Sequence, residues 1–192
     1  ALENLGRHEE AIRSAQTGLQ VAPEDEILRS LMETIVMDNL KFEDARRFFL
    51  EYVTRWPGNT WADAALLWAA RAAFAAADFT DAVEGVARLV REYPQSVRLS
   101  KARLLQVDAL MELARFDEAV LLLDPIIAKT QDGHAEDALF RKGDCLFAMG
   151  ANNGVRYKEA LYTYRELLLQ ENLSPLQVFQ LHYKVARCLE KL

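Results

Sequence analysis

The chain has 192 residues, of which 51% are hydrophobic and 27% charged, a balance typical of a folded globular protein. Eight glycines and five prolines are too few for a fold built from many tight β-turns, so we expect an almost entirely helical protein. A net charge of −6 opposes the phosphate neutralisation on which nucleic-acid binding depends, which excludes nucleic acid as the expected partner. The most apolar stretch, 64–77, is too short to span a membrane.

A short pattern ending in alanine occurs five times along the chain. The anchor alanines are spaced 34, 37, 37 and 41 residues apart, at Ala11, Ala45, Ala82, Ala119 and Ala160. An aromatic residue stands three positions before each of the last four anchors, at Phe42, Phe79, Phe116 and Tyr157. A proline stands twelve positions after each of the first three, at Pro23, Pro57 and Pro94. A period of this length predicts a repeat protein.

Each repeat reads as two helices. In the second repeat the apolar residues of 28–36 fall at i, i+3, i+4, i+7 and i+8, which places them on one helical face. After a turn at 41–44 the same spacing resumes and ends before Pro57, whose missing N–H stops a helix. The second helix therefore presents an apolar face formed by Ala45, Phe49, Tyr52 and Val53.

Capping residues predict where two of the later helices begin, and a proline and an insertion predict where two later repeats depart from the common pattern. Thr60 and Asp63 predict a capping box at the third repeat, and Ser174 followed by Pro175 predicts a capped start for the last helix. Pro125 should kink or shorten the helix that contains it. An insertion at 151–154 enlarges one hairpin turn, and it is either a contact loop or a tolerated surface insertion.

The order of small, aromatic and proline positions resembles the tetratricopeptide repeat (TPR) family, most clearly in 6–23, 42–57, 79–94 and 143–150. The resemblance implies an all-α, right-handed superhelical solenoid of stacked antiparallel helix hairpins. The expected units of this single array, 1–192, are 1–24 (partial), 25–60, 61–97, 98–133, 134–174 with an enlarged hairpin loop, and 175–192 (partial). Both ends then fall within a repeat, so we expect the segment to belong to a longer array.

A narrower similarity concerns residues 55–59 and 92–96 and the 37-residue spacing. They resemble TPR proteins of the bacterial cell envelope, such as the outer-membrane assembly lipoprotein and the Tol-Pal-associated type. This resemblance implies a periplasmic or cell-envelope location. The same short signal occurs in other bacterial TPR proteins, which leaves the cytoplasm open.

The sequence carries no pattern typical of catalysis, so we expect neither an enzyme nor a cofactor or metal site. His8, His134 and His182 lie far apart, and the common nucleotide-binding and serine-hydrolase motifs do not occur. Cys145 and Cys188 fall at equivalent places in consecutive first helices. Because packed helix axes lie about 8–10 Å apart, we expect two buried free thiols rather than a disulfide. A nucleophilic role for Cys145 would need an electropositive, accessible setting.

Three tryptophans, Trp56, Trp61 and Trp68, cluster next to an alanine-rich helix. They could form an exposed aromatic platform for a ligand, since tryptophan is enriched in binding hot spots. The alternative, which we favour, is that they fill the gaps left where small residues bring helices close together.

The resemblance to TPR proteins also implies that the first helix of each repeat lines the concave face, where ligands bind. The residues at these positions differ from the lysine, asparagine and arginine clamp that grips a terminal carboxylate in one TPR subclass. They form instead an apolar stripe with charged interruptions: Met37, Leu67, Arg71, Phe74, Leu104, Asp108, Met111, Phe140, Asp144, Phe147, Tyr183 and Arg187. The alternative is that Phe74, Met111 and Phe147 pack against the next repeat.

The function expected from these observations is a non-catalytic protein–protein interaction scaffold, in which a peptide or partner segment docks in the groove through apolar anchors. The cell-envelope resemblance implies a role in envelope assembly. Two alternatives remain: a regulatory or substrate-recruiting arm of a larger enzyme, and a self-assembly module. The sequence leaves the oligomeric state open.

Overall fold

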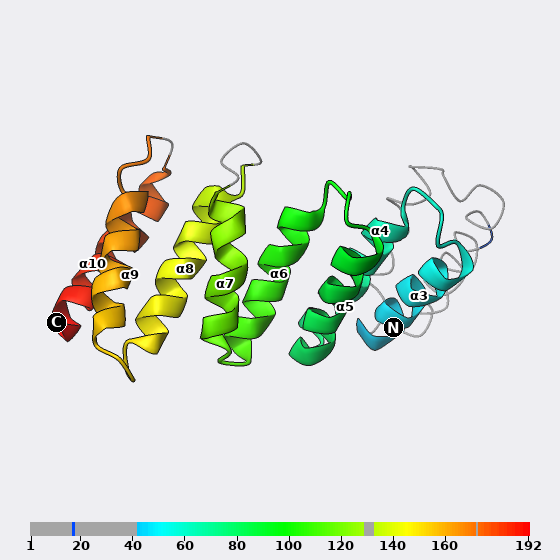
Figure 1. Cartoon of the computed structure of the whole chain (residues 1–192), viewed down its shortest axis with the longest axis horizontal. Helices are drawn as coiled ribbons and strands as arrows, with labels where there is room; N and C mark the ends of the chain where they lie inside the picture. The colour runs from blue at the N-terminus through cyan, green and yellow to red at the C-terminus, as the bar shows by residue number, and fades with distance from the viewer. Residues whose placement is uncertain (1–16, 18–41, 129–132, 172) are drawn as a thin grey trace, which may run out of the picture. The chain divides into compact units, whose positions relative to one another are not determined.

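The computed structural model describes residues 17, 42–128, 133–171 and 173–192, which form two compact units, 1–99 and 100–192. Within the described residues, the regular structure consists of eight α-helices and no strand (Figure 1). They are α3 (Phe42–Arg55), α4 (Ala62–Ala75), α5 (Phe79–Glu92), α6 (Leu99–Glu112), α7 (Phe116–Ile127), α8 (Ala135–Met149), α9 (Val155–Leu167) and α10 (Pro175–Lys191). The helix expected at 28–36 lies outside the described residues.

In the first unit α3 packs on α4, and α4 packs on α5. The anchor residues Ala45 and Ala82 are fully buried, which allows the helices of a hairpin to approach closely. The apolar face predicted for α3 is also confirmed, and this helix ends two residues before Pro57. In the turn before α5, Ala77 adopts a left-handed conformation with φ of 62°.

The middle helix of this unit, α4, is covered on nearly all sides because it lies between α3 and α5. Eleven of its 14 residues are buried, as expected for a helix that is apolar all round. The capping box predicted for its start is wrong: α4 has no side-chain cap. The N-cap is Trp61 rather than Thr60, and Asn59 Oδ1 accepts the Trp61 N–H at 2.8 Å. The Asp63 carboxylate is engaged by Ser96 and Arg98.

In the second unit α7 packs on α8, α8 on α9, and α9 on α10. The predicted start of α10 is confirmed, with Ser174 and Gln177 forming a capping box around Pro175. Pro125 lies inside α7, which has 12 residues compared with 14 in α5, in agreement with the predicted shortening. The insertion at 151–154 forms the exposed connection between α8 and α9.

The helices α8 and α9 approach each other closely at two glycines. A Cβ atom added to Gly143 would lie 2.3 Å from Tyr164 Cε1, and one added to Gly150 would lie 2.4 Å from the Tyr157 ring. Tyr164 is only 1% exposed and its hydroxyl is hydrogen-bonded to Asp144, so its ring has no free space into which to move. The hairpin therefore requires glycine at position 143.

We predict that Gly143→Ala lowers the free energy of unfolding by ~1–3 kcal/mol, the usual cost of overpacking a buried contact. Gly154→Ala is the matched control, since nothing lies within 4 Å of its added Cβ and its φ of −57° suits alanine. That control should leave stability unchanged or raise it by up to ~1 kcal/mol. Urea denaturation followed by circular dichroism measures both, and equal effects of the two substitutions would contradict this packing.

Candidate partner-binding surface

The candidate groove residues of the first unit lie on α4. Leu67 is buried, Arg71 is exposed and Phe74 is half-buried. The Phe74 ring contacts Phe79 of α5 edge to face, with ring centroids 5.3 Å apart. Phe74 therefore packs against the second helix of its own hairpin, next to the turn. Met37, the remaining candidate of the N-terminal half, lies outside the described residues.

The candidates of the second unit lie on α6, α8 and α10. On α6, Leu104 is buried and Met111 is half-buried. On α8, the half-buried rings of Phe140 and Phe147 contact aromatic rings of α9, with centroid separations of 6.4 and 5.2 Å respectively. Phe147 repeats the arrangement of Phe74, because it packs on Tyr157 beside its own hairpin turn. One side of these rings thus belongs to the hairpin core.

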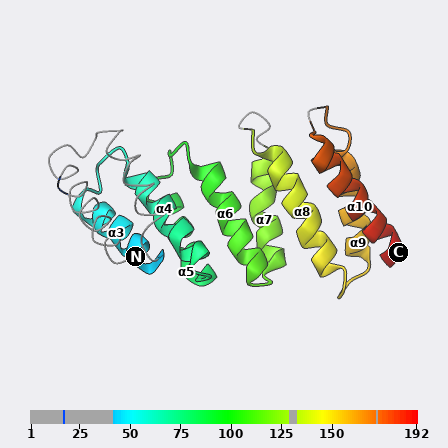
Figure 2. The same ribbon diagram turned by 180° about the vertical axis from the view of Figure 1, so that it is seen from behind.

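The charged candidates of α6 and α8 join consecutive first helices. Asp108 of α6 accepts two hydrogen bonds from the Arg141 guanidinium of α8, at 2.5 and 3.0 Å. Asp144 of α8 accepts a hydrogen bond from Lys184 Nζ of α10 at 2.5 Å, and α10 lies alongside α8 in Figure 2. The same position in two successive repeats therefore carries an acid that binds a base on the next first helix.

A second donor, the hydroxyl of Tyr164 on α9, reaches Asp144 Oδ1 at 2.6 Å. Burial, and then the charge of Asp144, raise the pKa of Tyr164 well above its usual value, so this hydroxyl keeps its proton and remains a donor. The Lys184 ammonium also lies 4.8 Å from the centroid of the Phe140 ring, a favourable cation–π geometry. Asp144 thus links three helices of the unit.

The α10 candidates are more open to solvent. Tyr183 is 57% exposed, and its hydroxyl accepts a hydrogen bond from Arg187 Nη1 at 3.2 Å. Arg187 Nε also forms an ion pair with Glu190 at 3.3 Å. An aromatic ring and a guanidinium are therefore presented together on the surface of α10.

A cavity of about 180 Å³ opens beside Phe140, between α8, the end of α9 and α10. Its lining residues are Glu136, Asp137, Phe140, Arg141, Leu167, Leu173, Gln177, Gln180 and Leu181. Sequence reasoning identified Phe140 and missed the others. One signal was available for Glu136, which precedes Phe140 by four residues and so lies on the same helical face.

The tryptophans are largely engaged in packing. Trp68 is only 8% exposed, and its ring centroid lies 5.3 Å from that of Phe49. Trp56 packs on Tyr52 at 4.9 Å, while Arg98 lies over the half-buried Trp61 at 5.4 Å. These contacts agree with the gap-filling interpretation.

Both thiols are free and buried. Burial and the neighbouring Asp144 raise the pKa of Cys145 to about 12, and burial also raises the pKa of Cys188. This is the opposite of the setting that activates a nucleophilic thiol. In the described part of the chain, no group of three or more metal-binding side chains occurs and no helix is long and apolar enough to cross a membrane.

We predict that iodoacetamide alkylates Cys145 of the folded protein very slowly at mildly alkaline pH. Raising a thiol pKa from 9.0 to about 12 lowers the thiolate fraction by ~10³-fold. The rate should increase with pH, because the thiolate is the reactive form. Mass spectrometry measures the modification, with the protein unfolded in guanidinium chloride as the control. Equal rates in the folded and unfolded protein would contradict the burial of this thiol.

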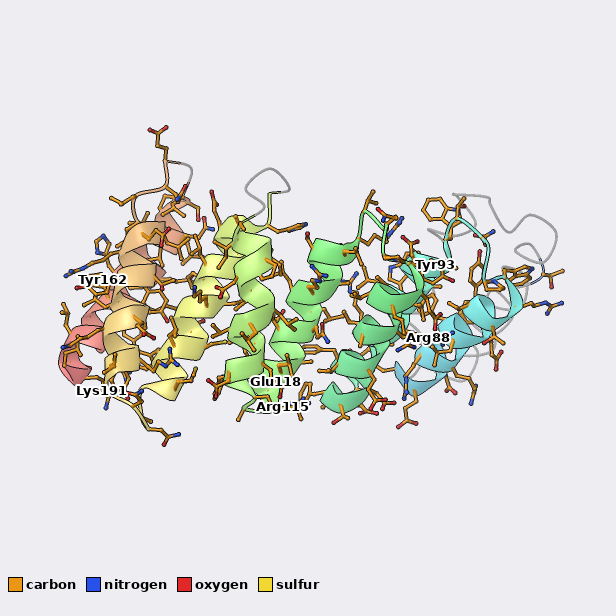
Figure 3. The ribbon with its side chains drawn as sticks, viewed as in Figure 1. Arg88, Tyr93, Arg115, Glu118, Tyr162 and Lys191 are labelled. Atoms are coloured by element: carbon orange, nitrogen blue, oxygen red, sulfur yellow. The ribbon has the colours of Figure 1, made fainter. Side chains whose placement is uncertain are left out.

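We also predict that Asp144→Asn lowers the free energy of unfolding by ~1–3 kcal/mol, because a half-buried Lys184 ammonium loses its charged partner. The control is Glu118→Gln, which breaks the solvent-exposed ion pair with Arg115 at the start of α7 (Figure 3). Exposed pairs contribute little to stability, so this variant should unfold like the parent. Chemical denaturation compares the two, and an unaffected Asp144→Asn variant would contradict the structural role of this carboxylate.

Consecutive helices that pack as hairpins around buried anchor alanines define a helical-repeat protein. Residues 30–176 match the family model described as a tetratricopeptide repeat-like domain, and the chain belongs to this family. The fold is similar to that of the crystal structure of BtubC (BKLC) from P. vanneervenii, with a TM-score of 0.68 and 13% sequence identity. That similarity covers 100% of this chain and 84% of BtubC. No curated protein matches the sequence.

Proposed function

We propose that the chain is a non-catalytic scaffold that binds a segment of a partner protein on the first helices α6, α8 and α10 of the second unit. Membership of the TPR-like family supports a protein-interaction role. The cavity beside Phe140, which opens between the first helices α8 and α10, is the observation that supports this location. The exposed Tyr183 lies on α10 of the same unit. A partner segment would find an apolar recess and exposed aromatic surface there.

In this proposal the half-buried carboxylates Asp108 and Asp144 position the binding surface and do not contact the partner. Asp108 and Asp144 hold neighbouring first helices together through Arg141 and Lys184, which fixes the spacing of the side chains that a partner contacts. Pre-organised surfaces bind more tightly, because less conformational entropy is lost on association. On α4 the exposed Arg71 and the half-buried Phe74 are proposed as partner contacts of the first unit, taken by itself.

We further propose that this scaffold acts in the assembly of the bacterial cell envelope. The support is the similarity of residues 55–59 and 92–96 to TPR proteins of that compartment. Fractionation of the source cells tests this proposal. Recovery with periplasmic or membrane-associated proteins would agree with it, and recovery with a cytoplasmic marker alone would contradict it.

The binding surface can be tested with a photoreactive amino acid at two exposed tyrosines. Tyr183 on the first helix α10 is 57% exposed, and Tyr162 on the second helix α9 is 69% exposed. Tyr162 is labelled in Figure 3. We predict that p-benzoylphenylalanine at position 183 crosslinks the partner, whereas the same group at position 162 does not. Electrophoresis and mass spectrometry detect the adducts. Crosslinking at position 162 of equal or greater yield would move the binding surface to the second helices.

A further inference from the structure

The cavity between α8, α9 and α10 has an apolar interior and a polar rim. Its apolar lining comes from all three helices and the connection after α9: Phe140, Leu167, Leu173 and Leu181. Its polar lining is carried by α8 and α10: Glu136, Asp137, Arg141, Gln177 and Gln180. A volume of about 180 Å³ is below the ~300–1,000 Å³ of ordinary small-molecule pockets. The space therefore suits one long side chain and is too small for a whole helix.

The basic side chains next to the cavity are already paired with carboxylates outside it. Arg141 binds Asp108 through two hydrogen bonds and also donates to the Asp137 carbonyl at 3.2 Å. Lys184, which lies over the Phe140 ring, is bound to Asp144. These cations are thus compensated by acids that do not line the cavity.

The two acids that do line it, Glu136 and Asp137, are exposed and stand in the first turn of α8. Among the described residues, no ion pair links either carboxylate to a basic side chain. The lining therefore carries two carboxylates beside Arg141, whose charge is compensated by Asp108. The amide of Gln180 and that of Gln177, whose Oε1 accepts the Ser174 N–H, add neutral polar groups.

We propose that this cavity receives a lysine or arginine side chain from the partner segment. Such a side chain has an apolar stem and a cationic tip, which matches an apolar interior beneath an acidic rim. A carboxylate-bearing side chain would be repelled by Glu136 and Asp137, and a purely aliphatic one would leave both charges without a partner. The inference rests on the proposed function, since it assigns the chemistry of one anchor within the same surface.

The test uses the whole chain and two small probes of similar side-chain length. Nα-acetyl-arginine methyl ester carries the cation, whereas Nα-acetyl-norleucine methyl ester carries an uncharged aliphatic side chain. In ¹H–¹⁵N NMR titrations the arginine probe should shift the side-chain amide signals of Gln177 and Gln180 and the backbone signals of residues 136–141. The norleucine probe should bind at least fivefold more weakly. Equal binding of the two probes would overturn the proposal.

Two variants locate the charge recognition. Glu136→Gln combined with Asp137→Asn should weaken arginine-probe binding at least fivefold. Its matched control is Asp117→Asn combined with Glu118→Gln, which removes two adjacent acids from the first turn of α7 and should bind the probe like the parent. Unchanged binding by the first variant, or an equal loss in the control, would overturn the proposal.

A third variant leaves the acidic first turn of α8 unchanged. Gln180→Lys places a cation at the exposed wall of the cavity on α10 and should also weaken the arginine probe at least fivefold. The crosslinking at Tyr183 separates this inference from the proposed function. Crosslinking of the partner without binding of the arginine probe would refute the anchor alone, whereas probe binding without crosslinking would refute the partner surface and leave the cation site standing.

Discussion

The close packing of paired helices at small residues is the constraint on which the rest of the structure depends. One alanine per hairpin, such as Ala82, Ala119 or Ala160, has no exposed surface. Where the contact is tightest, Gly143 accommodates the ring of Tyr164 against the backbone of α8. A larger side chain at such a point would push the helices apart, since protein interiors have no spare volume. The separation of the two helices then fixes which side chains reach the surface.

The connection between hairpins in the second unit depends on charge as well as apolar contact. Asp144 illustrates this, because its carboxylate binds Tyr164 of its own hairpin and Lys184 of the next first helix. Asp108 and Arg141 repeat the link one hairpin earlier. The ion pairs of Asp108 with Arg141 and of Asp144 with Lys184 thus maintain the spacing of α6, α8 and α10. Glu136 and Asp137, for which the described residues provide no ion pair, are exposed beside the cavity.

Much of the fold was accessible from the sequence, because the anchor alanines, the aromatic residues before them and Pro57 are local signals that recur with the repeat. The missing capping box of α4 could not be predicted in this way, since the Asp63 carboxylate binds Ser96 and Arg98, which lie more than thirty residues away in the sequence. The conformations of the turns at Ala77 and Ala114 could also not be predicted from the sequence. Alanine adopts positive φ values of 62° and 55° there, and such values usually favour glycine. Alignment of the fifth repeat with the others identified Phe140 and Phe147, but the structure was needed to show that their rings also pack on α9.

The most direct test of the account is hydrogen–deuterium exchange of the chain with and without its bound partner. The account holds that the partner lies on first helices of the second unit and that their spacing is set before binding. It predicts slower exchange in α8 and α10 on binding, with little change in α7 and α9. Protection confined to α7, α9 or the 151–154 connection would contradict it.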